Sequence, residues 1–125
     1  VLMAGDGGFM VNVGEMAAAA QENLPMVILL FDDKGYGVLR GIQDDVYDRR
    51  VGVELFTPDF VELAKSMGFE AERIKNAEEF RTGLQAAIDR KKPSMIVVDM
   101  NAVGPMASRG KTGPDIMKNY IPKKR

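Results

Sequence analysis

The segments Gly5-Asp6-Gly7-Gly8 and Asp32-Asp33-Lys34-Gly35-Tyr36-Gly37 decide the fold of this chain. Each follows an apolar run, Val1–Ala4 and Met26–Phe31, that is typical of a buried strand. The residues between the first segment and the second strand have the length of one helix. Strands joined by a helical crossover run parallel, so both segments are expected to leave the sheet at its carboxyl edge. Open α/β sheets bind their ligands at that edge.

The residue types in the two segments indicate a cation and a phosphate. Carboxylate oxygens such as those of Asp6 and Asp33 bind a hard cation such as Mg²⁺. Gly7 and Gly8 carry no side chains, so their backbone amides can approach phosphate oxygens closely at the start of a helix. A tight turn in which Asp6 caps the next helix needs the same residue types, and that alternative stays open.

Sequence patterns predict the remaining elements. Helical periodicity indicates a helix over 12–23 that begins soon after Gly8. Thr57-Pro58-Asp59 is typical of a helix start, with Thr57 as the N-cap and Pro58 in the first position. Alternating residues 69–74 indicate a short strand, and Asn76 begins a further helix through a capping box. The apolar run 95–98 is typical of a central parallel strand.

The alternation of these elements predicts an α/β fold, an open parallel sheet with helices on both faces. Residues 32–56 show no sustained period, and we expect at most a short helix over 39–43 inside a functional or mobile connection. We expect residues 1–103 to form one diphosphate- and Mg-binding domain. Residues 104–125, rich in Gly and Pro with a basic end, are expected to form an extended tail or an active-site lid.

Composition excludes several classes of protein. A net charge of −1 argues against charge-driven binding to nucleic acid or to a membrane surface. The chain has no Cys and no His, which excludes disulfides, thiolate metal sites and an imidazole base, and favours a cytoplasmic protein. No apolar run reaches membrane-spanning length. Because the first residue already lies inside a predicted strand, we expect a piece of a longer polypeptide, incomplete at its N-terminus.

The order of motifs resembles that of a known cofactor domain. Gly5-Asp6-Gly7, Asn12, Glu15, Asn23-Leu24-Pro25, a hydrophobic strand and Asp32-Asp33 are similar to the thiamine-diphosphate motif. The family includes acetolactate synthase, pyruvate decarboxylase and benzoylformate decarboxylase, and the resemblance is to its C-terminal diphosphate-binding domain. It extends to about Val103. The family pattern is Gly-Asp-Gly followed later by Asn-Asn, and here Asp32-Asp33 stands in place of the two asparagines.

The resemblance implies roles for individual residues. Mg²⁺ is expected to take the side chains of Asp6 and Asp33 and the backbone carbonyl of Gly35. The residues expected to bind thiamine diphosphate are Gly5, Asp6, Gly7, Gly8, Asp33, Gly35 and Tyr36. No residue of this chain is assigned a catalytic role, because the activating glutamate of the family lies on another domain. We expect Asp32 to support the loop by hydrogen bonding and Arg40 to be a solvated surface residue.

The resemblance also implies an activity. Such enzymes are lyases or transferases that decarboxylate 2-oxo acids or ligate the product to a second carbonyl. The chain is most like acetolactate synthase, with a benzoylformate-type decarboxylase as the alternative. The implied partners are a small 2-oxo acid and the pyrimidine-binding domain of a second subunit in a homo-oligomer, a dimer or a tetramer. The 125 residues alone are therefore expected to be inactive. Substrate, acceptor and any flavin stay open.

A Mg-binding receiver-type signalling domain is the alternative from another class. The length fits, and paired aspartates bind Mg²⁺ in such domains. However, the acidic pair of a receiver follows the first strand, whereas Asp32-Asp33 follows the second predicted strand. A receiver also has a Lys after its last strand, where this chain has Asp99-Met100-Asn101.

Overall fold

The structure is a computed structural model that describes residues 1–47 and 49–103. Within these residues a single parallel sheet is formed by the strands β1 (Leu2–Gly5), β2 (Val27–Asp32), β3 (Glu70–Ile74) and β4 (Ser94–Asp99). Their order across the sheet is β1-β2-β4-β3, so β2 and β4 are central. The predicted α/β class with a parallel sheet is confirmed.

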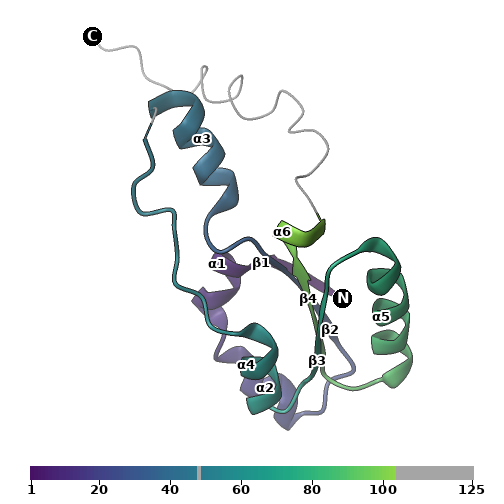
Figure 1. Cartoon of the computed structure of the whole chain (residues 1–125). Helices are drawn as coiled ribbons and strands as arrows, with labels where there is room; N and C mark the ends of the chain where they lie inside the picture. The colour runs from purple at the N-terminus through teal and green to yellow at the C-terminus, as the bar shows by residue number, and fades with distance from the viewer. Residues whose placement is uncertain (48, 104–125) are drawn as a thin grey trace.

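Helices cover both faces of the sheet (Figure 1). On one face lie α2 (Glu15–Gln21) and α4 (Phe60–Ser66), and on the other lies α5 (Ala77–Arg90). Alternate residues of β2 serve the two faces: Ile28 and Leu30 pack toward α2 and α4, whereas Val27 and Leu29 pack toward α5. Both faces of the central strands are therefore buried, which explains their unbroken apolar sequence.

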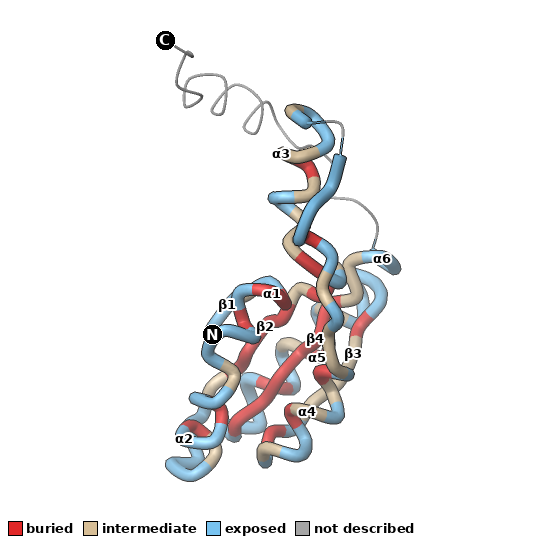
Figure 2. The backbone as a smooth tube through the Cα atoms, turned by 90° about the vertical axis from the view of Figure 1, so that its left-hand side faces the viewer, coloured by how far each residue is buried: buried red, intermediate tan, exposed pale blue. Residues whose placement is uncertain are grey.

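The core follows the central strands, where Figure 2 shows the buried residues concentrated. Leu30, Ile96 and Val97 have no exposed surface. Full burial of each such side chain stabilises the fold by about 1.5–3 kcal/mol relative to an exposed one. By contrast, Leu2 and Met3 of the outer strand β1 are 46% and 66% exposed. The most deeply buried part of the sheet is thus the pair β2–β4, and the turn with Asp33 follows directly at the carboxyl end of β2.

The first helical region differs from its prediction. Helix α1 (Asp6–Phe9) begins directly after β1, and a 3₁₀ turn, η1 (Met10–Asn12), separates it from α2. The prediction of a helix over 12–23 that begins after Gly8 was wrong about the start. The N-cap is Gly5, and Asp6, whose side chain accepts the N–H of Gly7, is already the first residue of the helix. Periodicity missed this turn because glycines add no apolar position to the pattern.

The start of α4 also differs from its prediction. Asp59, not Thr57, is the N-cap: its Oδ1 accepts the N–H groups of Val61 at 2.9 Å and Glu62 at 3.3 Å. A carboxylate that accepts two N–H groups satisfies more of the free donors of a helix start than a hydroxyl does. Thr57 instead lies 3.3 Å from the Lys34 ammonium.

Helix α3 (Gly37–Tyr47) is longer than the short helix predicted over 39–43. It extends beyond the carboxyl edge of the sheet (Figure 1). The returning segment is tied to it by side chains: Gln43 donates to the Val51 carbonyl at 3.1 Å and accepts the Val51 N–H at 2.6 Å. Arg50 adds a bidentate ion pair with Asp44, in which Nε donates to Oδ1 and Nη2 donates to Oδ2. These contacts between distant residues leave no period in the sequence.

The other predicted elements are present. Asn76 caps α5, with its side chain accepting the Glu79 N–H at 2.9 Å. A short helix that was not predicted, α6 (Met100–Val103), follows β4. The predicted tail or lid over 104–125 lies outside the described residues. None of the helices in the described ranges has the length and apolar character needed to cross a membrane.

Candidate functional site

The register of the sheet brings the two acidic segments together. Gly5, the last residue of β1, pairs with Phe31, the penultimate residue of β2. Asp6 and the turn after β2 therefore leave the sheet at the same level and on neighbouring strands. The predicted position of both segments at the carboxyl edge is confirmed.

Asp6 connects the two segments directly. Its side chain is 1% exposed, and its Oδ1 accepts the N–H of Gly7 at 2.8 Å. Its Oδ2 accepts the N–H of Gly35 at 2.9 Å. Each carboxylate oxygen has a second lone-pair site. The carboxylate is thus fixed by two N–H groups and still has acceptor capacity for a cation.

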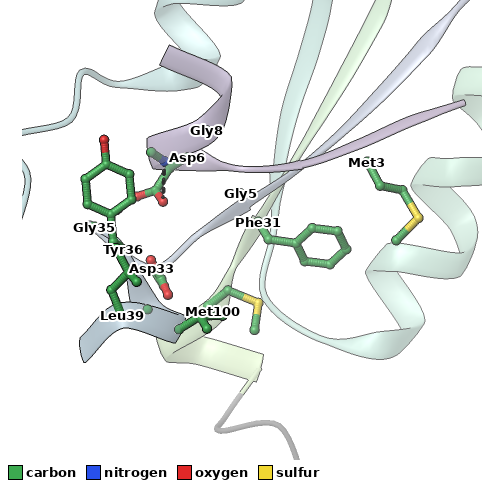
Figure 3. Close-up of a pocket in the computed structure, with 13 residues that line it drawn as sticks. Met3, Gly5, Asp6, Gly8, Phe31, Asp33, Gly35, Tyr36, Leu39 and Met100 are labelled. Carbon is green, nitrogen blue, oxygen red and sulfur yellow. Dashed lines mark hydrogen bonds between the residues drawn. The ribbon is translucent and has the colours of Figure 1, made fainter. Parts of the chain in front are cut away.

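Asp33 lies beside Asp6 (Figure 3), and one of its carboxylate oxygens lacks a hydrogen-bond partner. Its Oδ1 is buried and accepts no hydrogen bond within the described residues. Burial and the negative charge of Asp6 raise the pKa of Asp33, although the Arg40 guanidinium opposes them. Two carboxylates this close repel each other unless a cation lies between them. The geometry therefore fits a positive ion at this position.

The glycines of the site differ in whether neighbouring atoms leave room for a Cβ. A Cβ at Gly7 would lie 2.5 Å from the Tyr36 ring, so packing within the chain requires glycine there. A Cβ at Gly37 would lie 1.8 Å from Asp33 Oδ2, so this glycine makes room for the carboxylate. At Gly5 and Gly8 an added Cβ meets nothing within 4 Å. Neither residue has a positive φ, so the tight-turn alternative does not account for these two glycines.

A cavity of about 480 Å³ opens between the two segments. Figure 3 shows the carboxylates of Asp6 and Asp33 at one side of it, with Phe31 and Met100 along another. Its lining combines the glycines and carboxylates above with apolar side chains, namely Met3, Phe31, Tyr36, Val38, Leu39 and Met100. All seven residues predicted to bind the cofactor line this cavity: Gly5, Asp6, Gly7, Gly8, Asp33, Gly35 and Tyr36. An apolar pocket with a few convergent polar groups is typical of a cofactor site.

Asp32, like Asp33, has a buried Oδ1 without a hydrogen bond among the described residues, but its other oxygen is held by two cations. It is 1% exposed, and its Oδ2 accepts Lys34 Nζ at 2.9 Å and Arg73 Nη1 at 2.8 Å. Burial raises the pKa of Asp32, but the hydrogen bonds and charges of Lys34 and Arg73 outweigh burial and hold it below the usual value. The prediction that Asp32 supports the loop by hydrogen bonding is confirmed. Two cations around one carboxylate explain a charged residue at this position.

The prediction for Arg40 was wrong. Its side chain is only 14% exposed, and it donates to the backbone carbonyls of Asp33, at 2.7 Å, and of Lys34. It also pairs with Glu54, with Nη2 2.7 Å from Oε2. The only hint in the sequence is the position of Arg40, a few residues after the turn. The partner Glu54 lies in a segment without periodicity, so the pair was missed.

The donor set fits Mg²⁺ with incomplete protein coordination. No cluster of three or more metal-binding side chains occurs in residues 1–47 and 49–103. The donors predicted for the ion are the carboxylates of Asp6 and Asp33 and the carbonyl of Gly35, and all three residues line the cavity. Mg²⁺ is usually bound by one or two carboxylates, with waters and ligand phosphates completing the sphere. Such an ion would neutralise the facing carboxylates and engage Asp33 Oδ1.

Comparison with known proteins gives one consistent family. A model of the C-terminal thiamine pyrophosphate-binding domain of thiamine pyrophosphate enzymes matches residues 1–98. The probable acetolactate synthase large subunit of Methanococcus aeolicus is 36% identical over 98 residues, which are 77% of this chain and 16% of that protein. That of Methanocaldococcus jannaschii is 36% identical over 114 residues, 88% of this chain and 19% of that protein. The chain thus spans less than a fifth of these relatives.

Solved structures agree on the fold. The thiamine diphosphate-dependent 4-hydroxybenzoylformate decarboxylase of Rhodococcus jostii RHA1 superposes with a TM-score of 0.73 and 29% identity, over 78% of this chain and 19% of that chain. The benzoylformate decarboxylase of Polynucleobacter necessarius superposes with a TM-score of 0.71 and 23% identity, over 83% and 20% respectively. At its lower identity the second structure supports the fold alone.

Proposed function

This chain belongs to the thiamine pyrophosphate enzyme family, whose cofactor is thiamine diphosphate, and we propose that it forms the part of such an enzyme that holds the diphosphate and Mg²⁺. The observation that carries the proposal is the pair Asp6 and Asp33, which lie beside each other at the carboxyl edge, with Asp33 Oδ1 buried and without a hydrogen bond among the described residues. We assign the Mg²⁺ ligands as these two carboxylates and the Gly35 carbonyl.

The glycines contribute the phosphate side of the site. Gly8 lines the cavity, and an added Cβ there would point into open space that the chain itself does not use. Glycine at this position is explained if a diphosphate lies where the Cβ would be. The backbone N–H of Gly8 at the start of α1 is then close enough to donate to a phosphate oxygen, whereas that of Gly7, which also lines the cavity, donates to Asp6 Oδ1. Gly5 and Tyr36 complete the wall beside them.

The protein's contribution in this domain is binding and orientation. When bound, thiamine diphosphate supplies the electron sink that the decarboxylation of 2-oxo acids requires. Asp6 and Asp33 would anchor the charged end through the cation, and Phe31, Leu39 and Met100 give the cavity an apolar wall. We assign no catalytic residue to this chain. We propose that the pyrimidine-binding domain of a second subunit completes the site, so that the fragment alone is inactive.

The proposed activity is that of an acetolactate synthase-like carboligase acting on 2-oxo acids in a homo-oligomeric enzyme. Acetolactate synthases of archaea and bacteria are among the similar curated proteins, which supports this choice. A benzoylformate-type decarboxylase is the second candidate, favoured by the structural likeness at 29% identity. Membership of the thiamine pyrophosphate enzyme family removes the receiver-domain alternative. A cytoplasmic location stays a prediction from composition.

Product analysis of the full-length enzyme separates the two candidates. With pyruvate as the only substrate, a synthase forms acetolactate and CO₂, whereas the second candidate forms benzaldehyde and CO₂ from benzoylformate. The control is the Asp33→Ala variant, which lacks a proposed Mg²⁺ ligand and should form neither product. If the wild-type enzyme accepts neither 2-oxo acid while it binds thiamine diphosphate with Mg²⁺, the substrate assignment is wrong and the cofactor assignment stands.

A further inference from the structure

Arg40 reaches back from the first turns of α3 to the turn that follows β2. Its Nη1 donates to the carbonyl of Asp33 at 2.7 Å, and its Nη2 donates to the carbonyl of Lys34. One guanidinium therefore holds two consecutive peptide carbonyls of the turn. The planar fork of arginine suits this task, because its N–H groups point in fixed directions.

Glu54 fixes the guanidinium from the opposite side. Arg40 Nε donates to Glu54 Oε1 at 3.0 Å, and Nη2 lies 2.7 Å from Oε2, which makes the pair bidentate. Hydrogen bonding from Arg40, together with its charge, lowers the pKa of Glu54. The same region is joined by backbone hydrogen bonds, from the Tyr36 N–H to the Val53 carbonyl and from the Leu55 N–H to the Lys34 carbonyl.

These contacts select which carbonyl of the turn stays available. The carbonyls of Asp33 and Lys34 are occupied, whereas that of Gly35 accepts no hydrogen bond among the described residues. The turn also contains unusual backbone conformations, with φ of 65° at Lys34 and 155° at Gly35. Such conformations cost free energy and persist only where surrounding contacts fix them.

We propose that Arg40, held by Glu54, is a positioning residue that fixes the turn Asp33–Gly35 so that the Asp33 carboxylate and the Gly35 carbonyl face the cation. This inference rests on the proposed function, because it concerns the same cation site. Arg40 touches neither the cation nor the diphosphate in this account. It acts through the turn, as the residues around metal ligands commonly do.

Because Arg40 is positively charged, the direction in which its removal changes Mg²⁺ affinity distinguishes a positioning role from a purely electrostatic one. Arg40 Nη1 lies 3.8 Å from Asp33 Oδ1, so the positive charge by itself disfavours a cation beside that oxygen. If Arg40 acted by charge alone, its removal would strengthen Mg²⁺ binding. If Arg40 positions the turn, its removal weakens Mg²⁺ binding in spite of the charge.

The experiment measures the Mg²⁺ concentration that half-saturates thiamine diphosphate binding to the full-length protein, by titration calorimetry. We expect Arg40→Met to raise this concentration about tenfold or more. Arg40→Lys keeps the charge and loses the fork, so we expect only partial recovery. Glu54→Gln should raise the concentration in the same direction. Arg49→Met is the matched control, an exposed arginine of the same segment, and should match the wild type.

Each outcome has a defined meaning. An unchanged or lowered half-saturating concentration in Arg40→Met, with a lower melting temperature, shows a structural role alone and overturns the inference. If Arg40→Met fails to fold by circular dichroism, Glu54→Gln decides by the same criterion, since its carboxylate is largely exposed. If the wild-type protein does not bind thiamine diphosphate in Mg²⁺ at all, the proposed function itself fails.

Discussion

Asp6 Oδ2 accepts a hydrogen bond of 2.9 Å from the backbone N–H of Gly35, 29 positions further along the chain. This contact joins the end of β1 to the turn after β2. Because Asp6 is 1% exposed, water does not compete for the bond. A hydrogen bond to a charged group contributes about 1.5–3 kcal/mol to stability. The same residue thus fixes the fold at the carboxyl edge and supplies a proposed Mg²⁺ ligand.

Replacement of Asp6 should affect both stability and cofactor binding. Asp6→Ala leaves the N–H groups of Gly7 and Gly35 without their acceptor, which should lower the unfolding free energy by about 2 kcal/mol. It should also abolish Mg²⁺-dependent binding of thiamine diphosphate. Urea unfolding and calorimetry measure the two effects, with Asp89→Ala on the exposed side of α5 as the control. Unchanged thiamine diphosphate affinity would exclude the ligand role.

Replacement of Asp33 by Asn should raise the stability of the metal-free protein and lower its affinity for Mg²⁺. Asp33→Asn removes a charge that faces Asp6 and should stabilise the metal-free protein by about 1 kcal/mol. It keeps an oxygen at the same reach, so cofactor binding should persist with weaker Mg²⁺ affinity. Asp33→Ala removes the oxygen and should lose binding. Melting curves in the presence of a chelator and calorimetry with Mg²⁺ test this. Equal loss of binding in both variants would show that the carboxylate charge itself is required.

Two neighbouring glycines form a matched pair of variants. Gly7→Ala places a Cβ 2.5 Å from the Tyr36 ring and should destabilise the fold by about 1–3 kcal/mol. Gly8→Ala meets no atom of the chain within 4 Å and should leave the melting temperature unchanged or slightly raised. It should nevertheless weaken thiamine diphosphate binding, because the methyl group enters the proposed phosphate position. Full affinity in Gly8→Ala would mean that the diphosphate lies elsewhere.

Replacement of Asp32 should affect the unfolding free energy more than it affects Mg²⁺ binding. Asp32→Ala leaves Lys34 and Arg73 without their shared buried carboxylate, which should cost about 2 kcal/mol of unfolding free energy. The Mg²⁺ requirement of cofactor binding should change less than in Asp33→Ala. Chemical denaturation and calorimetry on the two variants allow the comparison. A larger loss of Mg²⁺ affinity in Asp32→Ala than in Asp33→Ala would reverse the roles assigned to the pair.

The parts of the fold that the sequence predicts are those with local signals. The apolar runs of β2 and β4 mark central parallel strands, and the crossover between β1 and β2 places Asp6 and Asp33 at one edge. The capping box at Asn76 is also local, because its two partners are three residues apart. Alternation and caps each involve neighbours in sequence, so a single chain displays them.

The features that escaped prediction depend on contacts between distant residues. Asp32 meets Arg73 across 41 positions, and Arg40 meets Glu54 across 14. Helix α3 is tied to the returning segment by Gln43 and Arg50, whose partners no periodicity reveals. The separate constraints on Gly7 and Gly8 also needed coordinates, because the Tyr36 ring that distinguishes them comes from another segment.

The most direct test of the cation site is crystallographic. Mn²⁺ can replace Mg²⁺ in crystals of the full-length protein with thiamine diphosphate, and its anomalous scattering locates the ion. We predict one anomalous peak at about 2.0–2.2 Å from oxygens of Asp6 and Asp33 and from the Gly35 carbonyl, with a diphosphate oxygen beside it. A peak away from these three residues, or an ion held without Asp33, would contradict the account.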